Sequence, residues 1–523
     1  MCKVGVLLLL GTRSPVAFAQ HDGEAPDRSQ RLRKEVRPVS AGPAMATYDL
    51  LVKNGTLIVP GVGPIKGDLA VKNGTIASIG ETIATSEADD VLDASNKVVM
   101  PGAVDAHFHL GIYRELGLDA TEETRSSLVG GATTVISYFR TGAHYLNRTG
   151  SYSEIFPEVL AAVDGKAWTD YGFHLAPMTV SQIGEISDLV NKHGVTSFKY
   201  YMFYKGFDLA SNSRDSQSFT MGDEYDLGHL FLIMEEINKV QQQRPDLRLS
   251  LSLHCEQSEL MRVFIDRVKS MGDPQNLKAY NDGRPPLTER VAIGEATTLA
   301  SHTGTNINLL HLSSGDAAGA AVQAREAYPW IDMRFETTLH HLCLDYETLD
   351  AQGGLGGKVN PPIRTKADNE LLWQRVADGD INWVASDHAC CMEELKGDKI
   401  WPATPGFGGT ALLYPVLISE GHNKRGLSLQ RVAELVSTNP ARAYNLPTKG
   451  NILPGFDADF TVVDTEKVQT VTTELCESGQ DHCPFEGVDL QGWPVHTVVG
   501  GQVNFRDAKV VGEPKGKYIA RNQ

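Results

Sequence analysis

The sequence lacks the features of a membrane protein, a nucleic-acid-binding protein or a disulfide-rich scaffold. Its 523 residues contain no apolar run close to the roughly 20 residues that span a bilayer. The formal net charge is −17, so neither nucleic acid nor an anionic membrane is expected as the main partner. Only seven cysteines are present and none forms a CxxC pair, which favours reduced thiols in a cytoplasmic protein.

The first 44 residues differ in character from the rest. Lys3 and the apolar run at residues 4–10 have the outline of a secretory signal, but the polar residues 12–15 interrupt it. Residues 20–44 are polar, contain proline and show no periodicity, which predicts disorder. A cleaved signal, a disordered extension and an upstream translation artefact all stay open.

Short strands and turns are predicted at both ends of the remaining chain. The pentapeptide Val-Lys-Asn-Gly-Thr occurs at residues 52–56 and again at 71–75, each time between strand-like runs. Each copy predicts a hairpin with an Asn-Gly turn. We expect residues 45–98 and 446–511 to form one small β-sandwich domain, and residues 512–523 to form a polar tail.

Residues 99–445 alternate between strand-like and helix-compatible segments. Eight candidate strands lie at residues 98–104, 133–139, 170–176, 196–202, 249–253, 307–310, 333–337 and 381–385. Eight parallel strands with helical crossovers predict an α/β fold, a (β/α)8 TIM-like barrel with long loops. A doubly wound open sheet is the alternative, but no GxGxxG follows any of the strands.

Polar side chains follow several of these strands at the point where each strand ends. His107 and His109 are two residues apart, so on a strand they point to the same face. His254, His311 and Asp387 follow the fifth, sixth and eighth strands. The carboxyl ends of barrel strands form the active-site face, so these side chains should meet there. Imidazoles and a carboxylate are ligands that zinc accepts.

Lys199 is the unusual member of the set because it lies inside the apolar fourth strand. Burial lowers the pKa of a lysine, and the neutral amine can add carbon dioxide to give a carbamate that bridges two metal ions. Two metal ions flanking a hydroxide would activate it and polarise a carbonyl. Asp387 would then pass the proton of that water to the leaving nitrogen, and Tyr204 would stabilise the oxyanion. A packing role is the alternative for Tyr204.

Five motifs contain the candidate ligands: Pro101-Gly102-x-x-Asp105-x-His107-x-His109, Ser197-Phe198-Lys199, His254-Cys255-Glu256, His311-Leu312-Ser313-Ser314 and Ser386-Asp387-His388. A sixth motif is Asn360-Pro361-Pro362-Ile363-Arg364. Together they resemble the metal-dependent amidohydrolase superfamily, in particular the cyclic amidohydrolases: dihydropyrimidinase and hydantoinase, allantoinase and dihydroorotase. The resemblance implies His107, His109 and Asp387 on one metal ion, His254 and His311 on the other, and carboxylated Lys199 between them. It also implies zinc as the usual metal and a homotetramer.

The branch within this group is less sharply marked. The segment from Phe198 through Tyr204 to Gly206 looks like dihydropyrimidinase and hydantoinase, and Gly111 stands where dihydroorotases carry an arginine. Residues 336–342 and 358–362 look more like dihydroorotase or allantoinase.

Two positions bear on the binding of the substrate ring. Gly408 stands where hydantoinases carry an asparagine that helps to hold the cyclic amide. With Tyr204 and Asn360, Gly408 completes the set of expected substrate-binding residues.

We therefore expect metal-dependent hydrolysis of a C–N bond in a cyclic amide or ureide by a metal-bridging hydroxide. A hydantoin or dihydropyrimidine ring would open to an N-carbamoyl amino acid. An allantoinase-like or other cyclic imide hydrolase is the alternative enzyme. A non-catalytic scaffold related to dihydropyrimidinase is the alternative from another class, and the complete ligand set argues against it.

Overall fold

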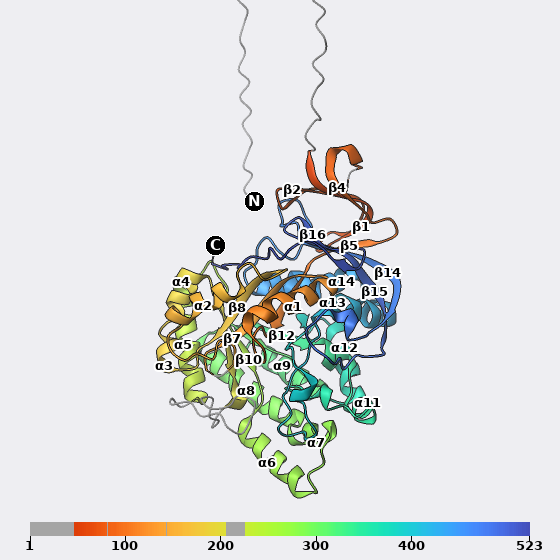
Figure 1. Cartoon of the computed structure of the whole chain (residues 1–523). Helices are drawn as coiled ribbons and strands as arrows, with labels where there is room; N and C mark the ends of the chain where they lie inside the picture. Colours follow the sequence, from red (N-terminus) through yellow and green to blue (C-terminus); the bar gives the residue numbers. More distant parts are fainter. Residues whose placement is uncertain (1–46, 81, 143, 205–224, 523) are drawn as a thin grey trace, which may run out of the picture. The chain divides into compact units, whose positions relative to one another are not determined.

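The computed structural model describes residues 47–80, 82–142, 144–204 and 225–522 (Figure 1). The signal or disordered extension expected at residues 1–44 lies outside the described residues. A parallel barrel surrounded by helices and a separate mixed sheet make up the described part (Figure 1). None of its helices combines the length and the apolar character that crossing a bilayer requires.

The barrel contains eight strands that lie side by side in sequence order. They are β6 (Ala103–Phe108), β7 (Ala132–Arg140), β8 (Asp170–Ala176), β9 (Ser197–Tyr201), β10 (Ser250–His254), β11 (Ile307–Leu309), β12 (Met333–Thr338) and β13 (Trp383–Ala385). The ring closes where Phe108 bridges His388 and the His109 amide donates to the His388 carbonyl at 2.8 Å. The predicted (β/α)8 barrel is confirmed, and the last seven strands lie within two residues of their expected bounds.

Helices connect the barrel strands and cover their outer face (Figure 1). The longer ones are α1 (Leu116–Val129), α2 (Tyr152–Val163), α4 (Ile186–His193), α5 (Leu227–Gln243), α6 (Ser258–Ser270), α8 (Pro286–Thr303), α9 (Gly315–Ala327) and α12 (Lys366–Ala377). The shorter ones are α3 (Val180–Ile183), α7 (Leu277–Gly283), α10 (Leu339–Cys343), α11 (Tyr346–Ala351), α13 (Leu413–Val416), α14 (Leu429–Ala433) and α15 (Asn439–Ala443). Ser314 caps α9 by accepting from the Ala317 amide, as expected for a serine at that position.

The two ends of the chain share one mixed sheet, so the domain predicted from both ends is confirmed. Its strands are β1 (Tyr48–Val59), β2 (Gly63–Lys72), β3 (Thr75–Ile79), β4 (Ala88–Asp93), β5 (Val98–Pro101), β14 (Phe460–Thr470), β15 (Asp489–Val499), β16 (Gln502–Arg506) and β17 (Lys509–Val510). The chain ends meet where β5 pairs antiparallel with β14. The sheet curls until Thr75 bridges Asp457, so one continuous sheet encloses the core of the expected sandwich.

The repeated pentapeptide adopts two different structures. The copy at residues 71–75 forms the predicted hairpin between β2 and β3. The hairpin predicted at residues 52–56 is wrong, because β1 continues through it with a bulge at Asn54. The paired strands account for this difference, because β1 pairs with β2 on one side and with β4 and β5 on the other. The Asp68 carboxylate accepts the Asn54 amide at 2.9 Å and holds the bulge.

The first predicted barrel strand combined two strands that the structure separates. β5 ends at Pro101 in the mixed sheet and β6 starts at Ala103 in the barrel. Between them, Gly102 lets the chain pass close to β7, because a Cβ there would lie only 2.2 Å from Thr133 Oγ1. The passage between the two sheets therefore falls at Gly102.

The C-terminal residues, expected as a polar tail, are fixed to the barrel. Tyr518 bridges Tyr171 at the start of β8. The buried Arg521 guanidinium donates to Ser197 Oγ at 2.8 Å and to the Phe173 carbonyl. Polar side chains of this C-terminal segment therefore make contacts inside the molecule, which the composition of the segment alone does not indicate.

Candidate metal centre and active site

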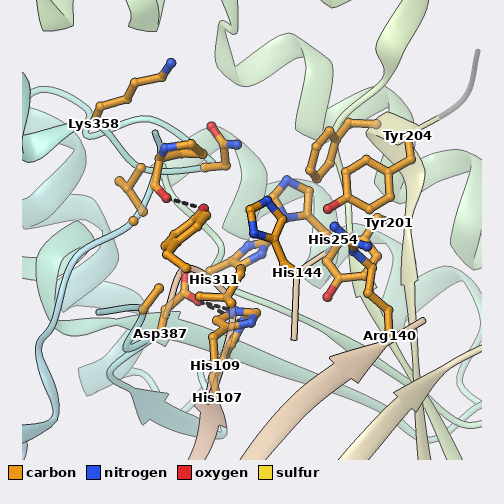
Figure 2. A pocket seen from close by; sticks show the side chains of 18 of the residues that line it. His107, His109, Arg140, His144, Tyr201, Tyr204, His254, His311, Lys358 and Asp387 are labelled. Atoms are coloured by element: carbon orange, nitrogen blue, oxygen red, sulfur yellow. Dashed lines mark hydrogen bonds and ion pairs between the residues drawn. The ribbon is translucent and has the colours of Figure 1, made fainter. Parts of the chain in front are cut away.

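Barrel closure brings the first group of expected ligands together. His107 and His109 lie at the carboxyl end of β6, and Asp387 follows β13, the strand that closes the ring beside it. Asp387 Oδ1 lies 3.0 Å from His107 Nε2 and 3.1 Å from His109 Nε2 (Figure 2). Burial alone would raise the pKa of Asp387, but the two imidazoles hold it well below its usual range.

The second group lies beside the first on the neighbouring strand ends. The imidazole centroids of His254 and His311 are 4.3 Å apart, and those of His107 and His311 are 5.3 Å apart. Lys199 is buried, with its Nζ 4.3 Å from the ring centroid of Tyr138. Burial lowers the pKa of Lys199 to about 7, so the neutral amine that a carbamate requires is accessible.

Two buried glutamates orient the imidazoles, a role that was not among the predictions from the sequence. Glu336 Oε1 lies 2.6 Å from His107 Nδ1, and Glu256 Oε2 lies 2.7 Å from His254 Nε2. A carboxylate only accepts, so each of these nitrogens carries the hydrogen and the other ring nitrogen keeps its lone pair. The His254-Cys255-Glu256 spacing could have revealed Glu256, because residues two apart share a face of a strand. No local signal reveals Glu336.

The residues present fit a divalent metal ion. His311 Nδ1 is buried and has no hydrogen-bond partner within the described part of the chain. A buried polar atom without a partner is costly, and metal coordination would remove that cost. The surrounding donors are imidazole nitrogens and a carboxylate, which zinc and similar ions accept.

The metal-ligand residues line a cavity that opens to solvent. Tyr204 and Asn360 line this cavity as expected. Figure 2 shows Tyr204 beside Tyr201 and Arg140, across the histidines from Lys358. The Arg140 guanidinium carbon lies 5.8 Å from the Tyr204 ring centroid.

The structure does not bring Gly408 to this cavity, unlike the other expected substrate-binding residues. The Gly408 amide donates to Gln480 Oε1 at 2.6 Å, and a Cβ there would lie 2.9 Å from His388 Cε1. Gly406 lines the cavity instead. Lys205 and Gly206, part of the motif around Tyr204, lie outside the described residues.

A second cluster of potential metal ligands is paired with the guanidinium of Arg114. Asp119, Glu123 and Cys390 lie together and are buried. Arg114 Nη1 lies 3.0 Å from Glu123 Oε1, 3.2 Å from Cys390 Sγ and 3.5 Å from Asp119 Oδ1. The guanidinium therefore occupies the position that a metal ion would need.

A parallel barrel with histidines, a lysine and an aspartate at the carboxyl ends of its strands defines a metal-dependent barrel hydrolase. Residues 365–503 match the model of the Amidohydrolase family. The resemblance to this family seen in the motifs of the chain is confirmed.

Relatives matched over nearly their whole length agree with this resemblance. The allantoinase of Rubrobacter xylanophilus is 29% identical over 476 residues, which cover 91% of this chain and 98% of the relative. The D-hydantoinase of Geobacillus stearothermophilus is also 29% identical, covering 90% and 96%.

Solved structures agree with the sequence relatives. A D-hydantoinase crystal structure superposes with a TM-score of 0.79 at 26% identity, covering 90% of this chain and 98% of that one. The L-hydantoinase (dihydropyrimidinase) of Arthrobacter aurescens gives a TM-score of 0.77 at 27% identity, covering 89% and 98%.

Proposed function

We propose that this protein hydrolyses a ring C–N bond of a cyclic amide or ureide, of hydantoin or dihydropyrimidine type. The observation that carries the proposal is the meeting of Asp387 Oδ1 with His107 and His109 at 3.0 and 3.1 Å, at the mouth of the barrel. Relatives named allantoinase and D-hydantoinase support it.

The ligand set divides into two metal positions. His107, His109 and Asp387 would hold one divalent ion, and His254 and His311 would hold the other. A carbamate on Lys199 would lie between them, and zinc is the expected metal. When bound, the ions lower the pKa of a water molecule and polarise the ring carbonyl.

Protein side chains then move the proton and stabilise charge. The Asp387 carboxylate accepts a proton from the attacking water and delivers it to the ring nitrogen as the C–N bond breaks. The Tyr204 hydroxyl donates a hydrogen bond to the carbonyl oxygen, where negative charge develops. The product carries a new carboxylate and a freed ureido or amide nitrogen.

Allantoin is the second candidate substrate. The observation that favours it is the set of relatives named allantoinase, which match 90–92% of this chain at 27–29% identity. Ring opening of hydantoin, dihydrouracil and allantoin by the purified protein, at equal concentrations, distinguishes the candidates.

Removal of the bridging amine tests the mechanism. Lys199→Ala should reduce ring opening by more than a thousandfold and lower the metal content below about two ions per chain. Added acetate should restore part of the activity, because a free carboxylate can enter the space of the carbamate. Lys192→Ala, on an exposed face of α4, is the control. Full activity of Lys199→Ala would exclude the proposed mechanism.

The expected assembly follows from the same resemblance, and the expected location follows from the few cysteines, none in a CxxC pair. The protein is expected to be a cytoplasmic homotetramer that acts on a small molecule. Light scattering after size exclusion should give four times the mass of one chain. A wild-type protein that purifies without metal and opens no ring would support the non-catalytic scaffold instead.

A further inference from the structure

A buried chain of side chains connects the metal ligand His254 to the cavity residue Asn360. His254 Nε2 lies 2.7 Å from Glu256 Oε2, and Arg284 Nε donates to Glu256 Oε1 at 2.9 Å. On its other side, Arg284 Nη1 donates to the Tyr280 hydroxyl at 2.5 Å and to Asn360 Oδ1. The Tyr280 hydroxyl in turn donates to Asn360 Oδ1 at 2.5 Å. One guanidinium therefore touches both halves of the site.

The chemistry of these groups settles the orientation of the Asn360 amide. A guanidinium can only donate, so the Asn360 atom that faces Arg284 must be the oxygen. The Nδ2 amide group then points away from Arg284. Asn360 is half-buried and lines the cavity, and none of the described residues accepts a hydrogen bond from Nδ2. The two N–H donors of Asn360 are therefore left without a described protein acceptor, on a residue that lines the cavity.

The same reasoning applies to the opposite end of the chain. Glu256 receives two donors from Arg284 and is held in place beside His254. Because the carboxylate accepts from His254 Nε2, the Nδ1 lone pair stays available to a metal ion. Arg284 therefore acts on His254 through Glu256 and on Asn360 directly.

We propose that Arg284 is a positioning residue for both ends of the site, and that Asn360 donates a hydrogen bond to a second carbonyl of the substrate ring. The inference rests on the proposed function, because it requires a cyclic amide in the cavity. The proposed hydantoin and dihydropyrimidine rings have two carbonyls around one N–H, and Asn360 would contact the carbonyl that is not hydrolysed. A lactam with a single carbonyl lacks that contact. A site built to hydrogen-bond a group rejects an analogue that lacks it.

A matched pair of ligands tests the substrate end. Succinimide and 2-pyrrolidinone have the same five-membered ring and differ by one carbonyl. The wild-type protein should bind succinimide about tenfold more tightly, the value of roughly one hydrogen bond. Asn360→Asp keeps the size and the acceptor for Arg284 but removes the donor. It should weaken succinimide binding about tenfold and 2-pyrrolidinone binding less than twofold. Equal losses for both ligands would overturn the assignment of Asn360.

Zinc titration of the metal-free protein tests the other end. Arg284→Met should lower zinc affinity about 10–100-fold, because His254 loses its orienting partner. Tyr280→Phe removes one hydrogen-bond donor to Asn360 and leaves the contacts of Glu256 intact. It should therefore leave zinc affinity unchanged and weaken the binding of succinimide. Unchanged zinc affinity in Arg284→Met would overturn the positioning role.

Misfolding of a variant and a lack of ring-opening activity in the wild-type protein each require a separate control. If Arg284→Met does not fold, Glu256→Gln tests the metal end and Tyr280→Phe tests the substrate end. If the wild-type protein binds and opens no ring, the proposed function fails. The zinc titrations would still decide whether Arg284 positions His254.

Discussion

Glu336 illustrates how one buried carboxylate can organise a metal site at the scale of single residues. Its Oε1 lies 2.6 Å from His107 Nδ1 and 3.1 Å from the His311 amide, and its Oε2 accepts from Trp383 Nε1 at 2.7 Å. Residues in or next to three strands, β6, β11 and β13, are thereby hydrogen-bonded to one side chain. The glutamate determines which nitrogen of His107 faces the metal position.

Glu336→Gln should therefore weaken metal binding without unfolding the barrel. The amide is the same size, but it can offer an N–H to His107 and allow the wrong tautomer. We expect zinc affinity to fall about 10–100-fold, measured by competition with a chelator. Glu326→Gln, on the exposed face of α9, is the control. Wild-type affinity in Glu336→Gln would contradict this role.

The ligands were predictable from the sequence because strand periodicity is local. His107 and His109 had to share a face, and the carboxyl ends of other strands had to meet them. Glu336 could not be assigned in this way, since it lies within β12 and meets His107 only in the folded barrel. Gly408 shows the converse limit: a motif position was carried over, but the local packing turns it toward His388 and Gln480.

At the scale of elements, Gly55 is the residue of the bulged pentapeptide in β1 that packs against Val99. A Cβ at Gly55 would lie 2.9 Å from Val99 Cγ2, so Gly55→Ala should destabilise the protein by about 1–3 kcal/mol through overpacking. Val99→Ala should rescue part of that loss in the double variant, seen as non-additive melting temperatures. Gly74→Ala, at a φ of +74°, should not be rescued by Val99→Ala, because its cost lies in the backbone.

If the changes in melting temperature caused by Gly55→Ala and Val99→Ala add up in the double variant, the two side chains do not clash as proposed. The comparison also shows what the sequence alone could not provide. Both copies place asparagine at positive φ, as the Asn-Gly pattern predicts. Whether the chain then reverses depends on the partners β4 and β5, which only the folded sheet supplies.

At the scale of the whole molecule, the C-terminal residues 512–522 act as a strap across the barrel. Deleting residues 512–523 would remove the Tyr518–Tyr171 bridge and the buried contacts of Arg521. The melting temperature should fall by several degrees, while Lys515→Ala, at an exposed position of the strap, should leave it unchanged. An unchanged melting temperature after the deletion would show that the strap adds no stability.

The alternation of strand and helix was enough to predict the barrel and the shared domain, because both follow from the order of elements. The strap was not predictable, since its polar composition is typical of a disordered end and its partners lie far away in the sequence. The contacts between the barrel and the sheet domain were equally hidden, and those of one lysine illustrate this.

Lys449 joins the barrel to the mixed sheet. Its Nζ lies 2.5 Å from Asp170 Oδ2, at the start of β8, and 2.5 Å from Asp459 Oδ2, just before β14. Asp457 Oδ2 is 3.0 Å away. Burial raises the pKa of Asp459 to about 6, with a contribution from Asp170, although Lys449 lowers it. The native state thus holds the Asp459 proton more tightly than the unfolded chain, whose aspartates have a pKa near 3.9.

The contribution of the Asp459 carboxyl to the free energy of unfolding therefore falls as the pH rises from about 4 to about 6. Above that range this contribution no longer changes with pH. Lys449→Met removes the only cation of the cluster, so the pKa of Asp459 should rise further and the loss should continue to higher pH. We expect a cost of about 3–5 kcal/mol at pH 8 and a smaller one at pH 5, measured by denaturant unfolding. Adding Asp459→Asn should flatten the pH dependence. A cost that is the same at both pH values would show that Lys449 contributes packing and not charge.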